Sequence, residues 1–161
     1  MLPIILPTRR IGLPPALALT MEGLEVVEVV MYDYHSYPRL FTEVWQKGTG
    51  FILVEDDVVP WPGALAELDG CDRECCGYEY PNAIIHEEPR SGWCASLGCT
   101  KFSQELTRRV PYDPEWQKRG WDSLDGAVFE TLQREGVEMH VHSPPVAHAK
   151  AQKLASRAVE L

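Results

Sequence analysis

The stretch Phe51-Ile-Leu-Val-Glu-Asp-Asp-Val-Val-Pro60 places four apolar residues directly before three consecutive carboxylates and ends in a proline. A short apolar run that contains β-branched residues indicates a strand buried inside a sheet. Because an unpaired carboxylate is costly to bury, the three acids are expected where the strand leaves the sheet. Ligands of open α/β sheets bind at the carboxyl ends of strands, so this stretch predicts both a central strand and a binding edge.

The three acids themselves indicate a cation site. Side chains alternate along a strand, so Glu55 and Asp57 are expected on one side and Asp56 on the other. Two hard oxygen ligands at one strand end suit Mg²⁺ or Mn²⁺. A solvated acidic corner between strand and loop is the alternative that this stretch leaves open.

Predicted strands and helices alternate before this stretch. Apolar runs predict strands over residues 2–6 and 24–31, and proline-led segments closed by glycine predict helices over 14–21 and 37–47. This order predicts an α/β fold of the Rossmann-like kind, with a mostly parallel sheet flanked by helices and right-handed crossovers.

The second half of the chain is expected to add helices and a strand. Apolar spacing predicts a helix over 100–110, a polar loop over 111–120, a strong helix from Trp121 to Gly136 and a strand over 137–142. We see no linker or repeat, so residues 1–161 are expected to form a single domain.

Composition restricts the functional class. The chain has 161 residues, 45% of them hydrophobic and 24% charged, as in soluble globular proteins. Its net charge of −9 argues against non-specific nucleic-acid binding. No apolar run reaches the roughly 20 residues of a membrane helix, and the N-terminus lacks the order of a signal peptide. We therefore expect a cytoplasmic protein.

The chain has five cysteines, at positions 71, 75, 76, 94 and 99. Together they could form a structural zinc site, although the spacing lacks paired Cys-x2-Cys knuckles. Reduced, buried thiols that act as small hydrophobes are the other interpretation, and the spacing favours it.

Three motifs in the first part of the chain resemble those of GT-A-fold glycosyltransferases, especially the large inverting family 2. Pro7-Thr8-Arg9 follows the first strand, as a similar loop does in the family. Asp33 ends the second strand, where the family has a nucleobase-contacting aspartate. Glu55-Asp56-Asp57, followed by Pro60, is similar to the family's Asp-x-Asp motif, with Glu in the first place.

The last third of the chain continues the resemblance. Residues 97–103 look like the acceptor-side segment of the family, and Asp125 then opens a helix that Gly136 ends. His148 lies twelve residues beyond that glycine, a spacing similar to the family's. The resemblance implies that Asp125 is the general base and that His148 joins Asp57 as a metal ligand.

The family likeness implies an activity. It implies an α/β GT-A-like domain that transfers a sugar, with inversion, from a nucleotide-sugar to an unknown acceptor, using Mn²⁺ or Mg²⁺; a UDP-sugar is the expected donor. The residues expected to bind this donor are Pro7, Thr8, Arg9, Asp33, Glu55 and Asp56. Arg9 and Arg10 could contact its phosphates, because guanidinium groups pair well with phosphate.

Other interpretations stay open. Only 24 residues separate Asp33 from Asp57, where the family has room for another strand and helix. A non-catalytic nucleotide- or glycan-binding protein on a degenerate GT-A fold would fit this short interval. A nucleotidyltransferase would share the carboxylates but would be expected to carry a glycine-rich basic loop, and residues 8–15 contain one glycine. His140 and His142 share a strand face and compete with His148 as metal ligands.

Overall fold

The computed structural model describes residues 1–8, 15–79, 97–120 and 123–148. The elements of the first half are β1 (Ile4–Thr8), α1 (Pro15–Met21), β2 (Val26–Val30), α2 (Ser36–Gln46), β3 (Phe51–Val54), β4 (Val58–Val59) and α3 (Ala64–Gly70). Those of the second half are β5 (Cys75–Tyr78), β6 (Cys99–Phe102), α4 (Gln104–Arg109), α5 (Glu115–Lys118), α6 (Leu124–Arg134), β7 (Met139–His142) and β8 (Ala147–His148).

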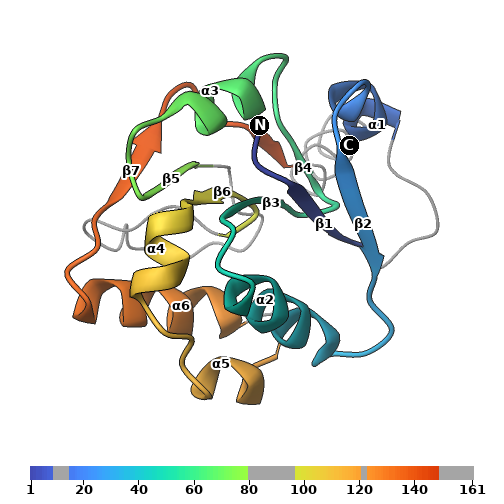
Figure 1. Ribbon diagram of the computed structural model, residues 1–161. Coiled ribbons are helices and arrows are strands. Elements are labelled where there is room, and N and C mark those ends of the chain that lie inside the picture. Colours follow the sequence, from blue (N-terminus) through green and yellow to red (C-terminus); the bar gives the residue numbers. More distant parts are fainter. Residues whose placement is uncertain (9–14, 80–96, 121–122, 149–161) are drawn as a thin grey trace, which may run out of the picture.

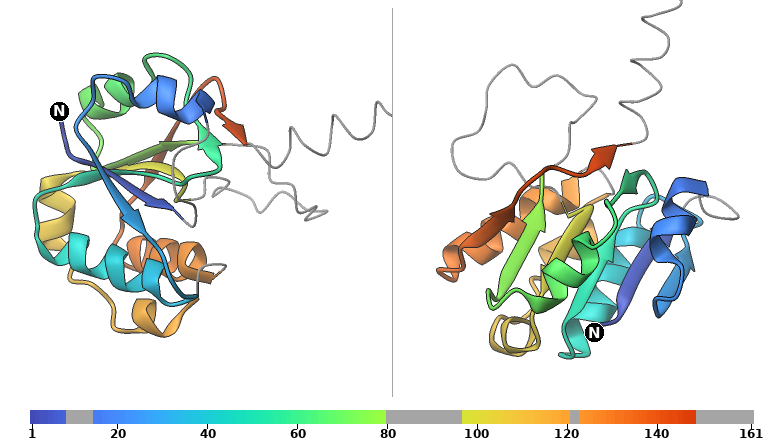
Figure 2. Two further views of the ribbon diagram at one scale, coloured as in Figure 1. Left: turned by 90° about the vertical axis from the view of Figure 1, so that its right-hand side faces the viewer. Right: turned by 90° about the horizontal axis from the view of Figure 1, so that it is seen from above.

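The main sheet has six strands in the order β2-β1-β3-β6-β5-β7 (Figure 2). β1 pairs in parallel with both β2 and β3, and β5 pairs in parallel with β7. β6 runs antiparallel to its two neighbours, so it alone is reversed within this sheet. The predicted α/β fold with a mostly parallel sheet is therefore confirmed, and the acidic stretch leaves β3 near the middle of the sheet.

Helices cover both faces of the sheet (Figure 1). α1 and α3 lie on one face, and α2, α4, α5 and α6 lie on the other. The strand residues alternate accordingly. Phe51 of β3 and Cys75 of β5 face the layer of four helices, whereas Ile52 and Cys76 face α1 and α3. Period-two alternation thus builds two cores from one set of strands.

A cluster of aromatic rings packs the helix layer that contains α2 and α6 against the sheet. The Trp45 ring of α2 lies 5.3 Å from the Phe102 ring of β6 and 5.1 Å from the Trp116 ring of α5, measured between centroids. Trp116 Nε1 in turn donates to Thr131 Oγ1 of α6 at 3.2 Å. Edge-to-face packing of this kind orients neighbours, so the cluster sets where α6 meets the sheet.

Two boundaries differ from the sequence expectation. The helix predicted over 100–110 begins only at Gln104, because Thr100 to Phe102 belong to β6. Ser103 caps the helix: its Oγ accepts a hydrogen bond from Leu106 N. The predicted loop 111–120 contains the short helix α5. None of the helices within the described ranges is long and apolar enough to span a bilayer.

Candidate active site

The three acids follow β3 at the sheet's carboxyl edge, as predicted, but they are not solvated. Exposed fractions are 8% for Glu55, 1% for Asp56 and 3% for Asp57. The alternative of a solvated acidic corner is therefore wrong. The chain turns immediately after Val54, and Val58 N donates to Glu55 O at 3.1 Å, so the turn folds the carboxylates into the protein.

Each of the first two acids has a specific donor. Tyr37 OH, in the first turn of α2, donates to Glu55 Oε1 at 2.9 Å. Thr8 Oγ1, the last residue of β1, donates to Asp56 Oδ2 at 3.2 Å. The donors come from opposite sides of the acidic turn, so Glu55 is held toward the helix layer of α2 and Asp56 toward the end of β1.

Asp125 lies close enough to this turn to influence it electrostatically. Burial first and the Asp125 charge second raise the pKa of Glu55 to about 8, although the hydrogen bond from the Tyr37 hydroxyl opposes part of this shift. Asp125 sits in the first turn of α6, and its Oδ2 accepts from Leu97 N at 3.2 Å. It is half-buried, in contrast to the three enclosed acids. The fold thus brings together the two acidic motifs that 68 residues separate in the sequence.

The backbone brings His148 to the same region. β8 pairs antiparallel with β4, and Val58 is the register partner of His148. His148 is therefore opposite the residue that follows Asp57. The buried carboxylate oxygens of the acidic turn are ligands of the kind that Mn²⁺ and Mg²⁺ prefer, and the backbone register is what relates His148 to them.

Asp33 lies beyond β2, in the predicted place, and its carboxylate is exposed and already engaged. Oδ2 accepts from Arg39 Nη2 at 2.7 Å, and Oδ1 accepts from His35 N at 2.8 Å. The hydrogen bond from Arg39 lowers the pKa of Asp33. Met31 N donates to Thr8 O at 2.7 Å, which joins the ends of β2 and β1.

The other predicted donor-site residues have different outcomes. Pro7 is buried within β1, opposite Val29. Thr8 is also buried, and its hydroxyl bonds Asp56. Arg9 and Arg10 lie outside the described residues.

Two histidines predicted as competing ligands lie elsewhere. His140 and His142 belong to β7, which β5 and β6 separate from β3. The ring of His142 bonds Glu67 through Nδ1 at 2.8 Å, so the idea that this pair serves the acidic turn is wrong.

The described cysteines do not all lie on one face of the sheet. Cys75 and Cys76 face opposite sides of the sheet, so the described cysteines do not form one shared site. Cys94 lies outside the described residues.

Sequence reasoning missed Tyr37 as a partner of Glu55. Its position in an apolar, helix-forming segment gave no sign that its hydroxyl would reach an acid on the next strand. The Thr8–Asp56 bond was equally hidden, because the two residues are 48 positions apart.

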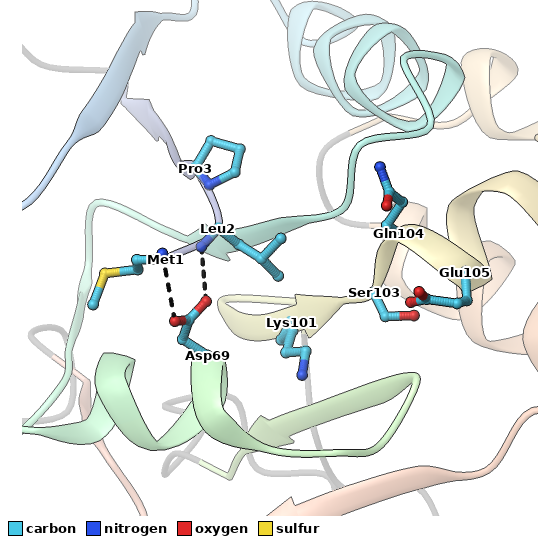
Figure 3. A pocket seen from close by; sticks show the side chains of 8 residues that line it. All are labelled: Met1, Leu2, Pro3, Asp69, Lys101, Ser103, Gln104 and Glu105. Atoms are coloured by element: carbon cyan, nitrogen blue, oxygen red, sulfur yellow. Dashed lines mark hydrogen bonds and ion pairs between the residues drawn. The ribbon is translucent and has the colours of Figure 1, made fainter.

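A hollow of about 420 Å³ lies at the other edge of the sheet (Figure 3). It is bordered by the start of β1, the end of β6 and the end of α3. Asp69 accepts a hydrogen bond there from Leu2 N at 2.7 Å. The hollow does not include the acidic turn.

Comparison with known proteins supports the fold. No protein-family model matches the sequence, and no curated protein matches it either. Among solved structures, the A197 protein from STIV has a TM-score of 0.57 at 12% identity, over 88% of this chain and 81% of that one. A glycosyltransferase involved in glycosylation of the major capsid of PBCV-1 has a TM-score of 0.52 at 14% identity, over the same two shares. The chain thus shares its fold with a glycosyltransferase.

Proposed function

We propose that this chain is a metal-dependent glycosyltransferase that moves a sugar from a nucleotide-sugar, expected to be a UDP-sugar, to an acceptor. The observation that carries the proposal is the gathering of Glu55, Asp56, Asp57 and Asp125 at the carboxyl edge of the sheet, three of them buried. Acids gathered in this way repel one another when ionised, and a bound divalent cation would offset that repulsion. The fold shared with a glycosyltransferase supports the same class of reaction.

Apart from Asp125, the predicted site residues divide into two roles. Asp57 and His148 would hold Mn²⁺ or Mg²⁺, which when bound supplies positive charge for a diphosphate leaving group. Pro7, Thr8, Arg9, Asp33, Glu55 and Asp56 would border the nucleotide-sugar. The hydrogen bonds from Thr8 to Asp56 and from Tyr37 to Glu55 support this assignment, because they would hold the two carboxylates in place before a ligand binds.

Asp125 would act as the general base. An acceptor hydroxyl attacks the anomeric carbon, the bond from that carbon to the diphosphate breaks, and Asp125 takes the hydroxyl proton. Attack opposite the leaving group inverts the anomeric centre. The half-buried position of Asp125 supports this role, because a base must be reachable by the acceptor, and the Leu97 N–H helps to fix the orientation of its carboxylate.

Titration calorimetry with a panel of nucleoside diphosphates tests the donor site. We expect one nucleotide to bind in the presence of Mn²⁺, and Asp57→Asn to abolish the metal-dependent part. Asp72→Asn is the matched control, since that acid is 97% exposed and carries no assigned role. If the folded wild type binds none of the nucleotides, the transferase proposal is overturned.

Turnover separates transfer from mere binding. Hydrolysis or transfer of the donor should fall by at least about 100-fold in Asp125→Asn, while nucleotide affinity stays close to that of the wild type. A second candidate function is binding of a nucleotide or glycan without turnover. The short interval between β2 and β3 favours this candidate, because the interval contains only α2 and β2 is left as the edge of the sheet. Binding without turnover for any sugar nucleotide would favour that candidate.

A further inference from the structure

A second group of potential metal ligands lies at the opposite side of the sheet from β2. Cys71 follows α3, Cys76 lies in β5, and His142 ends β7. One ligand atom from each residue lies within 4.8 Å of the other two. In a tetrahedral zinc site, bonds of about 2.3 Å to sulfur and about 2.1 Å to nitrogen place ligand atoms roughly 3.6 to 3.8 Å apart. The three atoms are therefore near the required spacing before any ion binds.

The histidine is already oriented as a metal ligand would be. His142 Nδ1 bonds Glu67 Oε1 at 2.8 Å, and the side chain of His142 is only 10% exposed. Its other nitrogen, Nε2, is buried and has no hydrogen-bond partner among the described residues. A carboxylate on one ring nitrogen fixes the tautomer and leaves the other nitrogen as the metal-binding atom. A buried nitrogen without a partner is costly, and a metal ion would remove that cost.

The sheet register explains how distant residues meet. Cys76 pairs with Lys101 of β6 on one side and with His140 of β7 on the other. Since alternate residues share a face, His142 points to the same face as His140, and its ring lies 4.6 Å from the His140 ring. Lys101 Nζ donates to Cys71 O, which ties the turn after α3 to this row of residues.

We propose that Cys71, Cys76 and His142 form a zinc site that joins the turn after α3 to the edge strand β7, with Glu67 as the outer carboxylate that orients His142. Two thiolates and one imidazole are soft and borderline ligands, which favour zinc over Mg²⁺ or Mn²⁺. The fourth position is left to water. On binding, each thiol loses its proton to solvent and each sulfur forms one bond to the ion, so no oxidant or reductant is needed. This site is independent of the proposed sugar transfer.

Zinc content and cobalt spectra of the full chain test the proposal. Reduced protein loaded with Zn²⁺ and passed through a desalting column should retain one equivalent. Replacement by Co²⁺ should give sulfur-to-cobalt charge-transfer absorption, which the carboxylate cluster cannot produce. Cys71→Ser and His142→Gln should each remove the retained zinc. Both side chains are partly exposed, so the variants are expected to fold.

Two further variants sharpen the result. Glu67→Gln should keep the ion but weaken its affinity by about 10–100-fold, as loss of an outer carboxylate does. Cys75→Ala is the matched control, because this neighbouring thiol faces the other core and should leave zinc binding unchanged. The proposal is overturned if folded, reduced wild type retains no zinc, if cobalt gives no thiolate absorption, or if His142→Gln retains the ion as well as the wild type does.

Discussion

Replacing Glu55 with glutamine should change how the stability of this protein depends on pH. The pKa of Glu55 is raised from its ordinary value of 4.5 to about 8, first by burial and then by the Asp125 charge. Glutamine keeps an oxygen that can accept the hydrogen bond from Tyr37 OH but carries no charge at any pH. The variant therefore removes the titration while preserving the shape of the site.

The sign follows from proton binding in the two states. Between about pH 4.5 and about pH 8 the folded protein keeps the Glu55 proton, whereas the unfolded chain has lost it. The free energy of unfolding then falls by about 1.4 kcal/mol per pH unit as the pH rises, and this contribution becomes constant above about pH 8. Relative to Glu55→Gln, the wild type should lose roughly 3–4 kcal/mol between pH 5 and pH 8.

Urea unfolding of both proteins across this pH range measures the effect. Taking the difference between wild type and variant cancels groups that titrate alike in both. A difference that stays constant within about 1 kcal/mol from pH 5 to pH 8 would refute the claim that Glu55 is buried beside other acids. Carboxyl carbon NMR then identifies the cause: Asp125→Asn should lower the pKa of Glu55, and Tyr37→Phe should raise it, because Asp125 and Tyr37 act in opposite directions.

Three substitutions test the framework around the site. Gly50→Ala should lower the free energy of unfolding by more than about 1–2 kcal/mol, which is the cost of placing an L-residue in the left-handed region. The loss should be larger because the added Cβ would also lie 2.7 Å from a backbone nitrogen. Gly23→Ala is the control for the conformational cost alone, because Gly23 has a φ of +78° and open space around it. Ser103→Ala should cost about 1 kcal/mol in a denaturation experiment, because the N-cap of α4 is lost. Arg109→Ala should change the free energy of unfolding by less than about 1 kcal/mol, because its ion pair with Glu74 is about half exposed; a larger loss would mean that this pair fastens α4 to β5.

The local sequence pattern was enough to predict the acidic strand end. The parts of the fold that were predicted wrongly depend on pairing between residues far apart in the sequence. The apolar run before Glu55 and the alternation of strands with helices were sufficient for the parallel part of the sheet. The segment from Thr100 misled because Phe102 fits a helical repeat with the apolar residues that follow it. In the fold, Phe102 is instead the register partner of Phe51 on β3, a contact that spacing within one segment cannot reveal.

The same limit applies to both sites. Asp125 could be linked to the acidic turn only through the family likeness, because nothing local says that α6 begins beside β3. The cysteine pattern suggested metal binding but gave the wrong partners, since Cys75 and Cys76 separate to opposite faces as soon as the segment becomes a strand. His142 enters the cluster through the β5–β7 register, which depends on a strand that lies more than 60 residues further along the chain.

The two proposed metal sites differ in ligand chemistry, and this difference determines how either can be measured. Oxygen ligands at the acidic turn suit Mn²⁺ or Mg²⁺, whereas the thiolates beside His142 favour zinc. A chelator used to prepare metal-free protein would therefore remove the ions from both proposed sites. It would loosen β7 as well as remove the cation from the acidic turn. Nucleotide binding lost after such treatment would not by itself implicate Asp57. Manganese titrations of the wild type and of Asp57→Asn should therefore start from zinc-loaded protein, and His142→Gln serves as the zinc-free comparison. Nucleotide binding that depends on Mn²⁺ in the wild type and in His142→Gln, but is lost in Asp57→Asn, would assign the catalytic cation to the acidic turn alone.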